Sequence, residues 1–187
     1  MRKNKNALVL LFLAAVVVIV MWRLGTRPAP RNSSPPAESG QSRLGPPDIY
    51  PDPARTPGAR NPEITQANLT ETICNPRWST RFIRPPRAYT SQLKFQQIRE
   101  YGYSDTAMRD YEEDHLIPLE LGGSPSDPRN LWPEPYETSI PDGGARYKDQ
   151  VENYLRAEVC AGQITLEQAQ NAILGDWYRV YATSVPR

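Results

Sequence analysis

The sequence predicts an α+β domain preceded by an N-terminal membrane anchor and a Pro-rich linker. Two short strand-like segments enclose a loop rich in Gly and Pro, and two amphipathic helical segments follow them. Ahead of these segments, residues 26–62 show almost no periodic apolar pattern. The expected boundaries are therefore 1–25 for the anchor, 26–62 for the linker and 63–187 for the folded domain.

The N-terminus has the pattern of a membrane signal. Arg2, Lys3 and Lys5 precede an uncharged run at 7–22, which would span roughly 24 Å as a helix. No pair of small residues suited to cleavage follows this run, so an uncleaved anchor is favoured over a cleaved signal. In both cases the positive flank predicts an extracytoplasmic chain, which is membrane-anchored or, after cleavage, secreted.

Proline dominates the segment that follows the anchor. Residues 26–62 hold ten of the twenty prolines, together with Ser, Gly and Arg. A segment of this composition buries too little apolar surface to offset the entropy lost on ordering. We therefore expect a disordered linker that is stiffened and extended by its prolines.

The elements of the domain are separated by turn residues. Residues 64–72 predict a short helix, and 91–101 predict a helix that ends at Gly102. Residues 111–119 and 130–133 predict two short strands. This part of the chain therefore has the order helix, helix, strand, loop, strand.

Two helices are expected to close the domain. Residues 146–161 carry apolar side chains on one face, and 165–181 begin with the capping box Thr165-Leu166-Glu167-Gln168. Trp132 and Trp177 are expected in the core rather than in a binding site.

The two cysteines, Cys74 and Cys160, are both placed beyond the anchor. A metal site is the rival interpretation, but two thiols with no histidine nearby make a poor zinc site. In an oxidising compartment we expect a disulfide, which closes a loop of about 85 residues and contributes roughly 4 kcal/mol.

The folded part is acidic on average but contains a basic stretch. Residues 63–187 carry 13 Lys/Arg and 18 Asp/Glu, a net charge of −5. Basic residues nevertheless predominate between residues 75 and 110. The candidates for phosphate contacts there are Arg77, Arg81, Arg84, Arg87 and Lys94. Such side chains position phosphates without reading bases, although surface arginines are by default only solvated charges.

The only histidine of the 187 residues, His115, follows the acidic triplet at 112–114. An apolar run comes next and is closed by Pro118 and the pair Gly122-Gly123. A lone histidine is more often structural than catalytic. An adjacent carboxylate and imidazole, however, are able to hold a divalent metal and activate a water. The stretch therefore indicates hydrolytic chemistry, with phosphodiester cleavage as the natural candidate.

This order of strand, loop, strand and helix resembles the ββα-metal core of the HNH endonuclease superfamily. More narrowly, the chain is similar to small bacterial HNH-like proteins with a DHLIPLELGG…NLWPE signature, which lies at 114–123 and 130–134. The resemblance covers about residues 64–181, and its central motif is specific because several residue types recur at fixed spacing. It implies an HNH-like core with additional helices.

The resemblance also implies roles for individual residues. Asp114 stands where the family has a metal-binding carboxylate, and His115 stands where the general base takes a proton from the attacking water. Asn130 corresponds to the asparagine that braces the loop and helps to hold the histidine ring. Mg²⁺ suits a site of carboxylates and water, with Mn²⁺ or Zn²⁺ as alternatives.

One position departs from the family pattern. The family's third site residue, a His or Asn that lies shortly before a lysine, is missing from 143–147, ahead of Lys148. Asp149 or Glu152 is expected to replace it as an oxygen ligand; otherwise the site is incomplete. Alternation also places Glu120 on the same side as Asp114, where it would support the metal ligands.

We therefore expect a metal-dependent nuclease with low sequence specificity that acts outside the cytoplasm. Its expected partners are nucleic acid, with DNA favoured over RNA, and the membrane through the N-terminal segment, with no small-molecule cofactor. The alternative is a catalytically degenerate HNH-like module that binds nucleic acid or a protein partner. A third possibility is a disulfide-stabilised envelope protein that keeps only the fold.

Overall fold

The structure, a computed structural model, describes residues 43–186. The predicted anchor at 1–25 and residues 26–42 of the predicted linker lie outside the described residues. Within 43–186 the chain is α+β, as predicted, with three α-helices and one two-stranded antiparallel sheet. None of the helices in this part of the chain is long and apolar enough to cross a membrane.

The sheet is a hairpin of β1 (Tyr111–His115) and β2 (Leu131–Pro135). In its register Asp114 is opposite Trp132, and Glu112 is opposite Glu134. Because side chains alternate along a strand, these four residues share one face of the hairpin, and His115 lies on the other.

β1 ends four residues earlier than predicted. Pro118 has no N–H to donate to a ladder, and a 3₁₀ helix follows it at Leu119–Leu121. β2, in contrast, continues two residues beyond the predicted end at 133. The apolar run after His115 therefore forms the start of the connecting loop instead of extending the strand.

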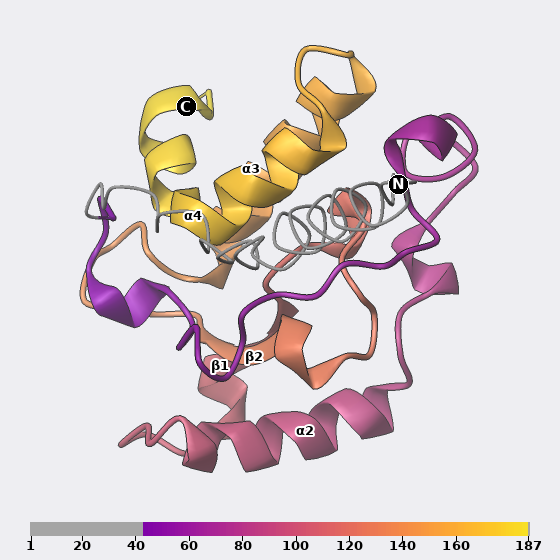
Figure 1. The fold of residues 1–187 in the computed structure, drawn as a ribbon. Helices are drawn as coiled ribbons and strands as arrows, with labels where there is room; N and C mark the ends of the chain where they lie inside the picture. The colour runs from indigo at the N-terminus through magenta and orange to yellow at the C-terminus, as the bar shows by residue number, and fades with distance from the viewer. Residues whose placement is uncertain (1–42, 187) are drawn as a thin grey trace, which may run out of the picture. The chain divides into compact units, whose positions relative to one another are not determined.

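Helices cover both sides of the hairpin, as Figure 1 shows. Helix α2 (Arg87–Glu100) contacts both strands from one side, and α3 (Ala145–Cys160) and α4 (Leu166–Ser184) lie on the other side. α2 starts four residues earlier than predicted, directly after Pro86, because proline is favourable ahead of a first turn. The helix expected at 64–72 is only a 3₁₀ turn at Gln66–Asn68.

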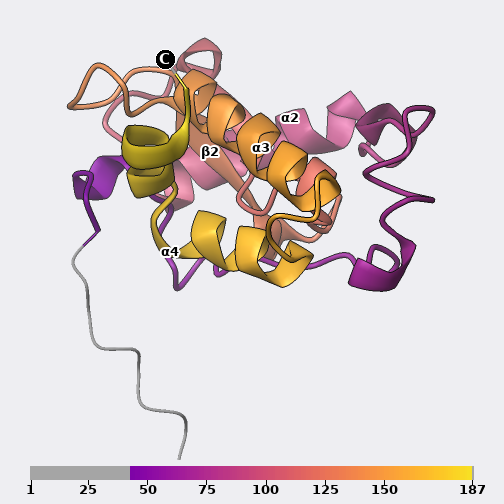
Figure 2. The same cartoon turned by 90° about the horizontal axis from the view of Figure 1, so that it is seen from above.

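The capping box predicted for α4 is present. The Thr165 side chain accepts from the Gln168 amide at 3.1 Å, and the Gln168 side chain accepts from the Thr165 amide at 2.8 Å. α4 is kinked at Asp176, whose backbone is not helical, and its two parts lie at an angle in Figure 2. The Asp176 carboxylate accepts hydrogen bonds from the Tyr50 hydroxyl and the Leu44 amide.

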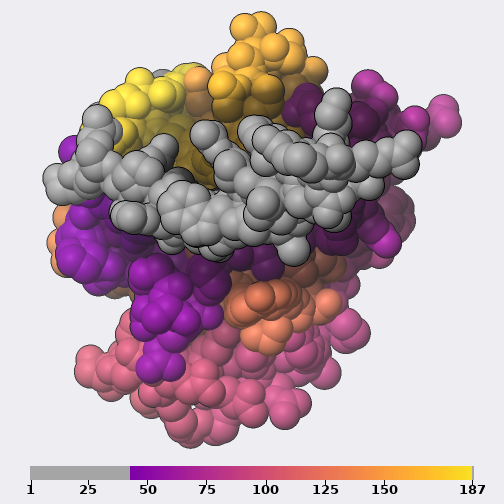
Figure 3. All heavy atoms as spheres, viewed as in Figure 1, coloured from indigo at the N-terminus to yellow at the C-terminus, as the bar shows by residue number. Residues whose placement is uncertain are grey.

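The linker prediction is wrong for residues 43–62, which pack against the domain. Ile49 is fully buried, and its carbonyl accepts a hydrogen bond from the Trp177 indole at 3.1 Å. Thr56 is also buried and bonds the Tyr101 hydroxyl. Figure 3 shows part of this indigo segment packed between the yellow C-terminal helix and the pink region of α2. A few apolar and aromatic side chains anchor the segment, although its proline content is high.

The core lies between the hairpin and helices α3 and α4. Trp132 and Trp177 are both completely buried, as predicted. Val151 from α3 and Ile173 from α4 belong to the same apolar cluster. The packing of α3 onto the hairpin brings the helix's first turns next to β1, and these turns carry the residues of the candidate site.

The predicted disulfide between Cys74 and Cys160 is also present. The two Cα atoms are 5.4 Å apart, and 86 positions separate the residues along the chain. Next to this bond, the Arg156 guanidinium donates to the Ile73 carbonyl at 2.9 Å. The disulfide thus joins the irregular segment before α2 to the end of α3.

We predict that Cys74→Ser lowers the free energy of unfolding by about 4 kcal/mol, because the unfolded chain then regains the freedom that the long closed loop denied it. Urea denaturation of the oxidised proteins measures this difference. Cys160→Ser and the double variant serve as controls and should lose the same amount, since each removes the same bond. An unchanged denaturation midpoint for Cys74→Ser would contradict the prediction.

Candidate functional site

Asn130, the last residue of the loop that connects the two strands, fixes the start and the middle of that loop. It is completely buried, and its side-chain amide donates to the carbonyls of Ile117 and Ser124, each at 3.0 Å. Its side-chain oxygen accepts from the Ile117 amide at 2.9 Å. This is the bracing position that the resemblance implies for Asn130. The side chain shapes the loop from within.

The glycine pair allows the loop to fold back on itself. Gly122 has a φ of +74°, a left-handed conformation that glycine adopts without cost. A Cβ on Gly123 would lie 1.7 Å from the Ile117 carbonyl oxygen, so no other residue fits there. With Asn130, these two glycines place the next residues of the loop beside the end of β1.

The imidazole of His115 is held by this loop. His115 is only 3 % exposed, and its Nε2 lies 2.9 Å from the Pro125 carbonyl oxygen. A carbonyl oxygen only accepts hydrogen bonds, so Nε2 carries the hydrogen, and in the neutral ring the lone pair is on Nδ1. Burial lowers the pKa of His115 below its ordinary 6.5, against the opposing effect of Asp114. At neutral pH the ring is therefore an uncharged base.

Asp114 points to the opposite side of the strand, towards helix α3. Its Oδ2 is 2.5 Å from the Lys148 ammonium, and Lys148 is completely buried. Burial by itself raises the pKa of Asp114, but the charge of Lys148 and hydrogen bonds from Glu134 and Lys148 lower it overall. Asp114 is therefore a stable carboxylate.

Lys148 also joins the other groups of this cluster. Its ammonium donates to Glu152 Oε1 at 2.5 Å and to the His115 carbonyl at 3.1 Å. Glu134 Oε2 is 3.9 Å away. The Gly144 position makes this approach possible, because a Cβ there would lie 2.0 Å from the Tyr136 carbonyl oxygen. The first turn of α3 thus comes close enough for Lys148 to reach β1.

Glu134 is the site residue that the sequence analysis missed. It is 1 % exposed, on the same face of the hairpin as Asp114. Burial and the neighbouring Asp114 raise its pKa well above the ordinary range, against the charge of Lys148, and this favours the form that donates a hydrogen bond to Asp114. The signal was present in the sequence, because alternation from Asn130 places Trp132 and Glu134 on one face.

Two further acidic residues are partly buried and have raised pKa values. Burial raises the pKa of Glu113 to about 8, and its oxygens have no hydrogen-bond partner. Burial also raises the pKa of Glu120, against the charges of Arg156, Lys148 and Arg84. Glu120 thus lies close enough to Lys148 to feel its charge, but it belongs to the 3₁₀ helix Leu119–Leu121, so the strand alternation that predicted its position does not apply.

The predicted metal ligands do not form a metal site in this arrangement. The Glu152 carboxylate accepts a hydrogen bond from Lys148. Asp149, which follows Lys148 on α3, is exposed. Among residues 43–186, no group of three or more His, Cys, Asp or Glu side chains has the arrangement needed to hold a metal ion. The donor set does not fit Mg²⁺ here, because the ammonium already takes the oxygens that would bind it and repels a second cation.

The four arginines among the five predicted phosphate contacts are all exposed. Arg84 is exposed and close enough to His115 and Asp149 for its charge to affect the pKa of both. Arg87 is also exposed and lines a polar pocket of about 410 Å³ beside β1. Arg77 and Arg81 are exposed earlier in the same segment.

Lys94 has a structural role instead. Its ammonium donates to the carbonyls of Met108 and Tyr111, both at 2.8 Å, and ties α2 to the start of β1. Two of its three donors are therefore used within the fold, and the exposed arginines are the better candidates for phosphate.

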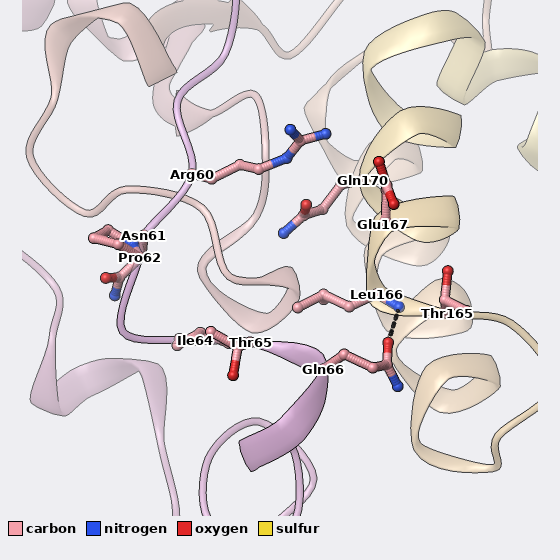
Figure 4. Close-up of a pocket in the computed structure, with 10 residues that line it drawn as sticks. All are labelled: Arg60, Asn61, Pro62, Ile64, Thr65, Gln66, Thr165, Leu166, Glu167 and Gln170. Carbon is pink, nitrogen blue, oxygen red and sulfur yellow. Dashed lines mark hydrogen bonds between the residues drawn. The ribbon is translucent and has the colours of Figure 1, made fainter.

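A second pocket, of about 420 Å³, lies between the extended chain at 60–66 and the start of α4. Figure 4 shows that Gln66 and Leu166 meet there, and the Leu166 amide donates to Gln66 at 2.7 Å. Arg60 and Glu167 are the charged side chains that line it. No predicted site residue does, so this pocket is not the candidate site.

Comparison with known proteins adds no relative: no family model, no curated protein and no solved structure matches this chain. The resemblance to the HNH superfamily therefore rests on the sequence motif alone.

We predict that NMR titration of His115, the only histidine, gives a pKa below 6.5 with the proton of the neutral ring on Nε2. The unfolded chain binds this proton more readily. The stability contributed by the neutral ring is therefore complete above about pH 6.5 and is lost as the pH falls through the folded-state pKa. Unfolding of wild type and His115→Asn from pH 5 to 8 is the matched measurement. A pKa above 6.5, or a proton on Nδ1, would contradict the prediction.

Proposed function

We propose that this chain is an HNH-type nuclease that hydrolyses phosphodiester bonds with low sequence specificity. The observation that carries the proposal is the state of His115. A buried, neutral imidazole is held through Nε2 by the Pro125 carbonyl, which leaves Nδ1 as the acceptor. This is the form that a general base needs at neutral pH.

The proposed reaction uses side chains of the chain itself. Nδ1 of His115 takes a proton from a water, the resulting hydroxide attacks phosphorus, and the bond to the leaving oxygen breaks. In this proposal Arg84, whose charge acts on His115, offsets the charge that develops on the phosphate oxygens. Asn130 takes no part in proton transfer and acts by holding the loop that orients the ring.

The surface beside the site supports nucleic acid as the substrate. Phe82 is 71 % exposed, the highest value among the exposed large hydrophobic residues of the described chain. It lies in the 3₁₀ helix Thr80–Phe82, next to Arg81 and two residues before Arg84. An exposed aromatic ring among arginines suits a stacked base and its phosphates, and stacking of this kind tolerates any sequence.

The anchor and the compartment remain proposals that rest on the N-terminal sequence. We propose an extracytoplasmic nuclease that is tethered by residues 1–25. DNA is the first substrate to test, and the disulfide between Cys74 and Cys160 fits an oxidising compartment.

A second candidate function is a module that binds nucleic acid without cleaving it. Lys148 favours this alternative, because its ammonium lies between Asp114 and Glu152, where the resemblance implies a metal. Both candidates predict binding, and only the nuclease predicts turnover.

We predict that His115→Ala reduces plasmid nicking by the full-length chain at least about 100-fold, the size expected for loss of a general base. The assay is run with Mg²⁺, with Mn²⁺ and with EDTA. Glu167→Ala, on the surface of α4 and away from the site, is the control and should keep full activity. Absence of cleavage in every condition, or cleavage that survives His115→Ala, would exclude the proposed nuclease.

We also predict that Phe82→Ala weakens binding of single-stranded DNA by about 10-fold, because a stacked base is lost, and affects duplex DNA less. Arg84→Ala should weaken both and reduce the salt dependence, since it removes a phosphate contact. Fluorescence anisotropy with His115→Ala as the parent measures both effects. Arg55→Ala, an exposed arginine paired with Asp52, is the matched control. Equal affinities for all variants would exclude this surface.

A further inference from the structure

We propose that the Lys148 ammonium is the internal cation of this site and takes the position that the resemblance assigns to a divalent metal. The inference rests on the HNH-type site proposed above. It assigns Lys148 the role of a positioning residue, which keeps Asp114 and the end of β1 in place without a bound ion.

The first support is the coordination of Lys148. A lysine ammonium has three N–H donors, and all three find oxygen atoms here. They go to Asp114 Oδ2 at 2.5 Å, to Glu152 Oε1 at 2.5 Å and to the His115 carbonyl at 3.1 Å. The side chain of Lys148 is 1 % exposed, so no water replaces these partners.

The second support is the position of Glu134. This side chain is 1 % exposed, and its Oε2 lies 3.9 Å from the Lys148 ammonium. Three carboxyl groups thus converge on one buried point from β1, β2 and α3. Oxygens from separate elements converge in this way around a cation, and the cation here is Lys148.

The third support is the link between Lys148 and the base. Lys148 binds the side chain of Asp114 and the backbone of His115, so it holds two successive residues of β1 from helix α3. A metal held by Asp114 would fix only the side chain. Lys148 therefore fixes the strand end from which the imidazole projects.

The experiment measures Mn²⁺ binding to the full-length chain without substrate, by calorimetry and by broadening of the His115 NMR signals. Wild type should show no binding at this site up to millimolar Mn²⁺, and its melting temperature should be the same in Mn²⁺ and in EDTA. Lys148→Met vacates the position between the carboxylates and should bind Mn²⁺ at least 10-fold more tightly. Adding Glu152→Gln to Lys148→Met should weaken that binding again.

Lys94→Met is the matched control, since it also removes a lysine bonded to backbone carbonyls, and it should leave Mn²⁺ binding unchanged. Stoichiometric Mn²⁺ binding by wild type that Asp114→Asn abolishes would overturn the inference. A folded Lys148→Met that binds no more tightly than wild type would also overturn it. If Lys148→Met does not fold, the His115 NMR signals of the wild type decide: broadening by Mn²⁺ overturns the inference, and unbroadened signals support it. The Mn²⁺-binding experiment contains no nucleic acid, so a negative result for Lys148 is distinct from a negative result in the nicking assay.

Discussion

The ion cluster around Lys148 is the interaction on which the arrangement of the candidate site depends. One ammonium joins the first turns of α3 to β1 through Asp114 and the His115 carbonyl, and to its own helix through Glu152. A buried charge is costly unless every donor finds a partner, so this lysine tolerates few changes in the distance between helix and strand. The absence of a side chain at Gly144 lets the start of α3 lie against the backbone at the end of β2, where a Cβ would be 2.0 Å from the Tyr136 carbonyl oxygen.

The loop between the strands imposes the second constraint, and it acts on the imidazole itself. Asn130 ties Ile117 to Ser124, and the Pro125 carbonyl then meets Nε2 of His115. Asp114 and His115 are neighbours in the chain but face opposite sides of β1, so each is fixed by a different part of the fold. The Asp114 carboxylate is held by Lys148 of α3, and the His115 ring is held by the Pro125 carbonyl of the loop. The two side chains therefore depend on two independent sets of contacts.

Much of the fold could be predicted because local rules decide it. The capping box at Thr165, the turn at Gly102 and the burial of Trp132 and Trp177 follow from short-range patterns that tertiary contacts did not override. The linker prediction failed for residues 43–62 because composition alone takes no account of Ile49, which finds a place against Trp177. Those contacts span more than 120 positions, and no local pattern encodes them.

The sequence by itself determined which groups are available: one histidine, an adjacent carboxylate, a bracing asparagine and a helix without the expected third ligand. It also indicated the disulfide, since two cysteines allow only one pairing. Only the tertiary structure decided what fills the centre of the site. Asp149 and Glu152 were the predicted ligands, but the helix turns Asp149 outwards and directs Lys148 inwards. The reason is physical: one residue along a helix is a rotation of about 100°, and the distance between α3 and β1, set by packing around Gly144, selects which side chain reaches the carboxylates.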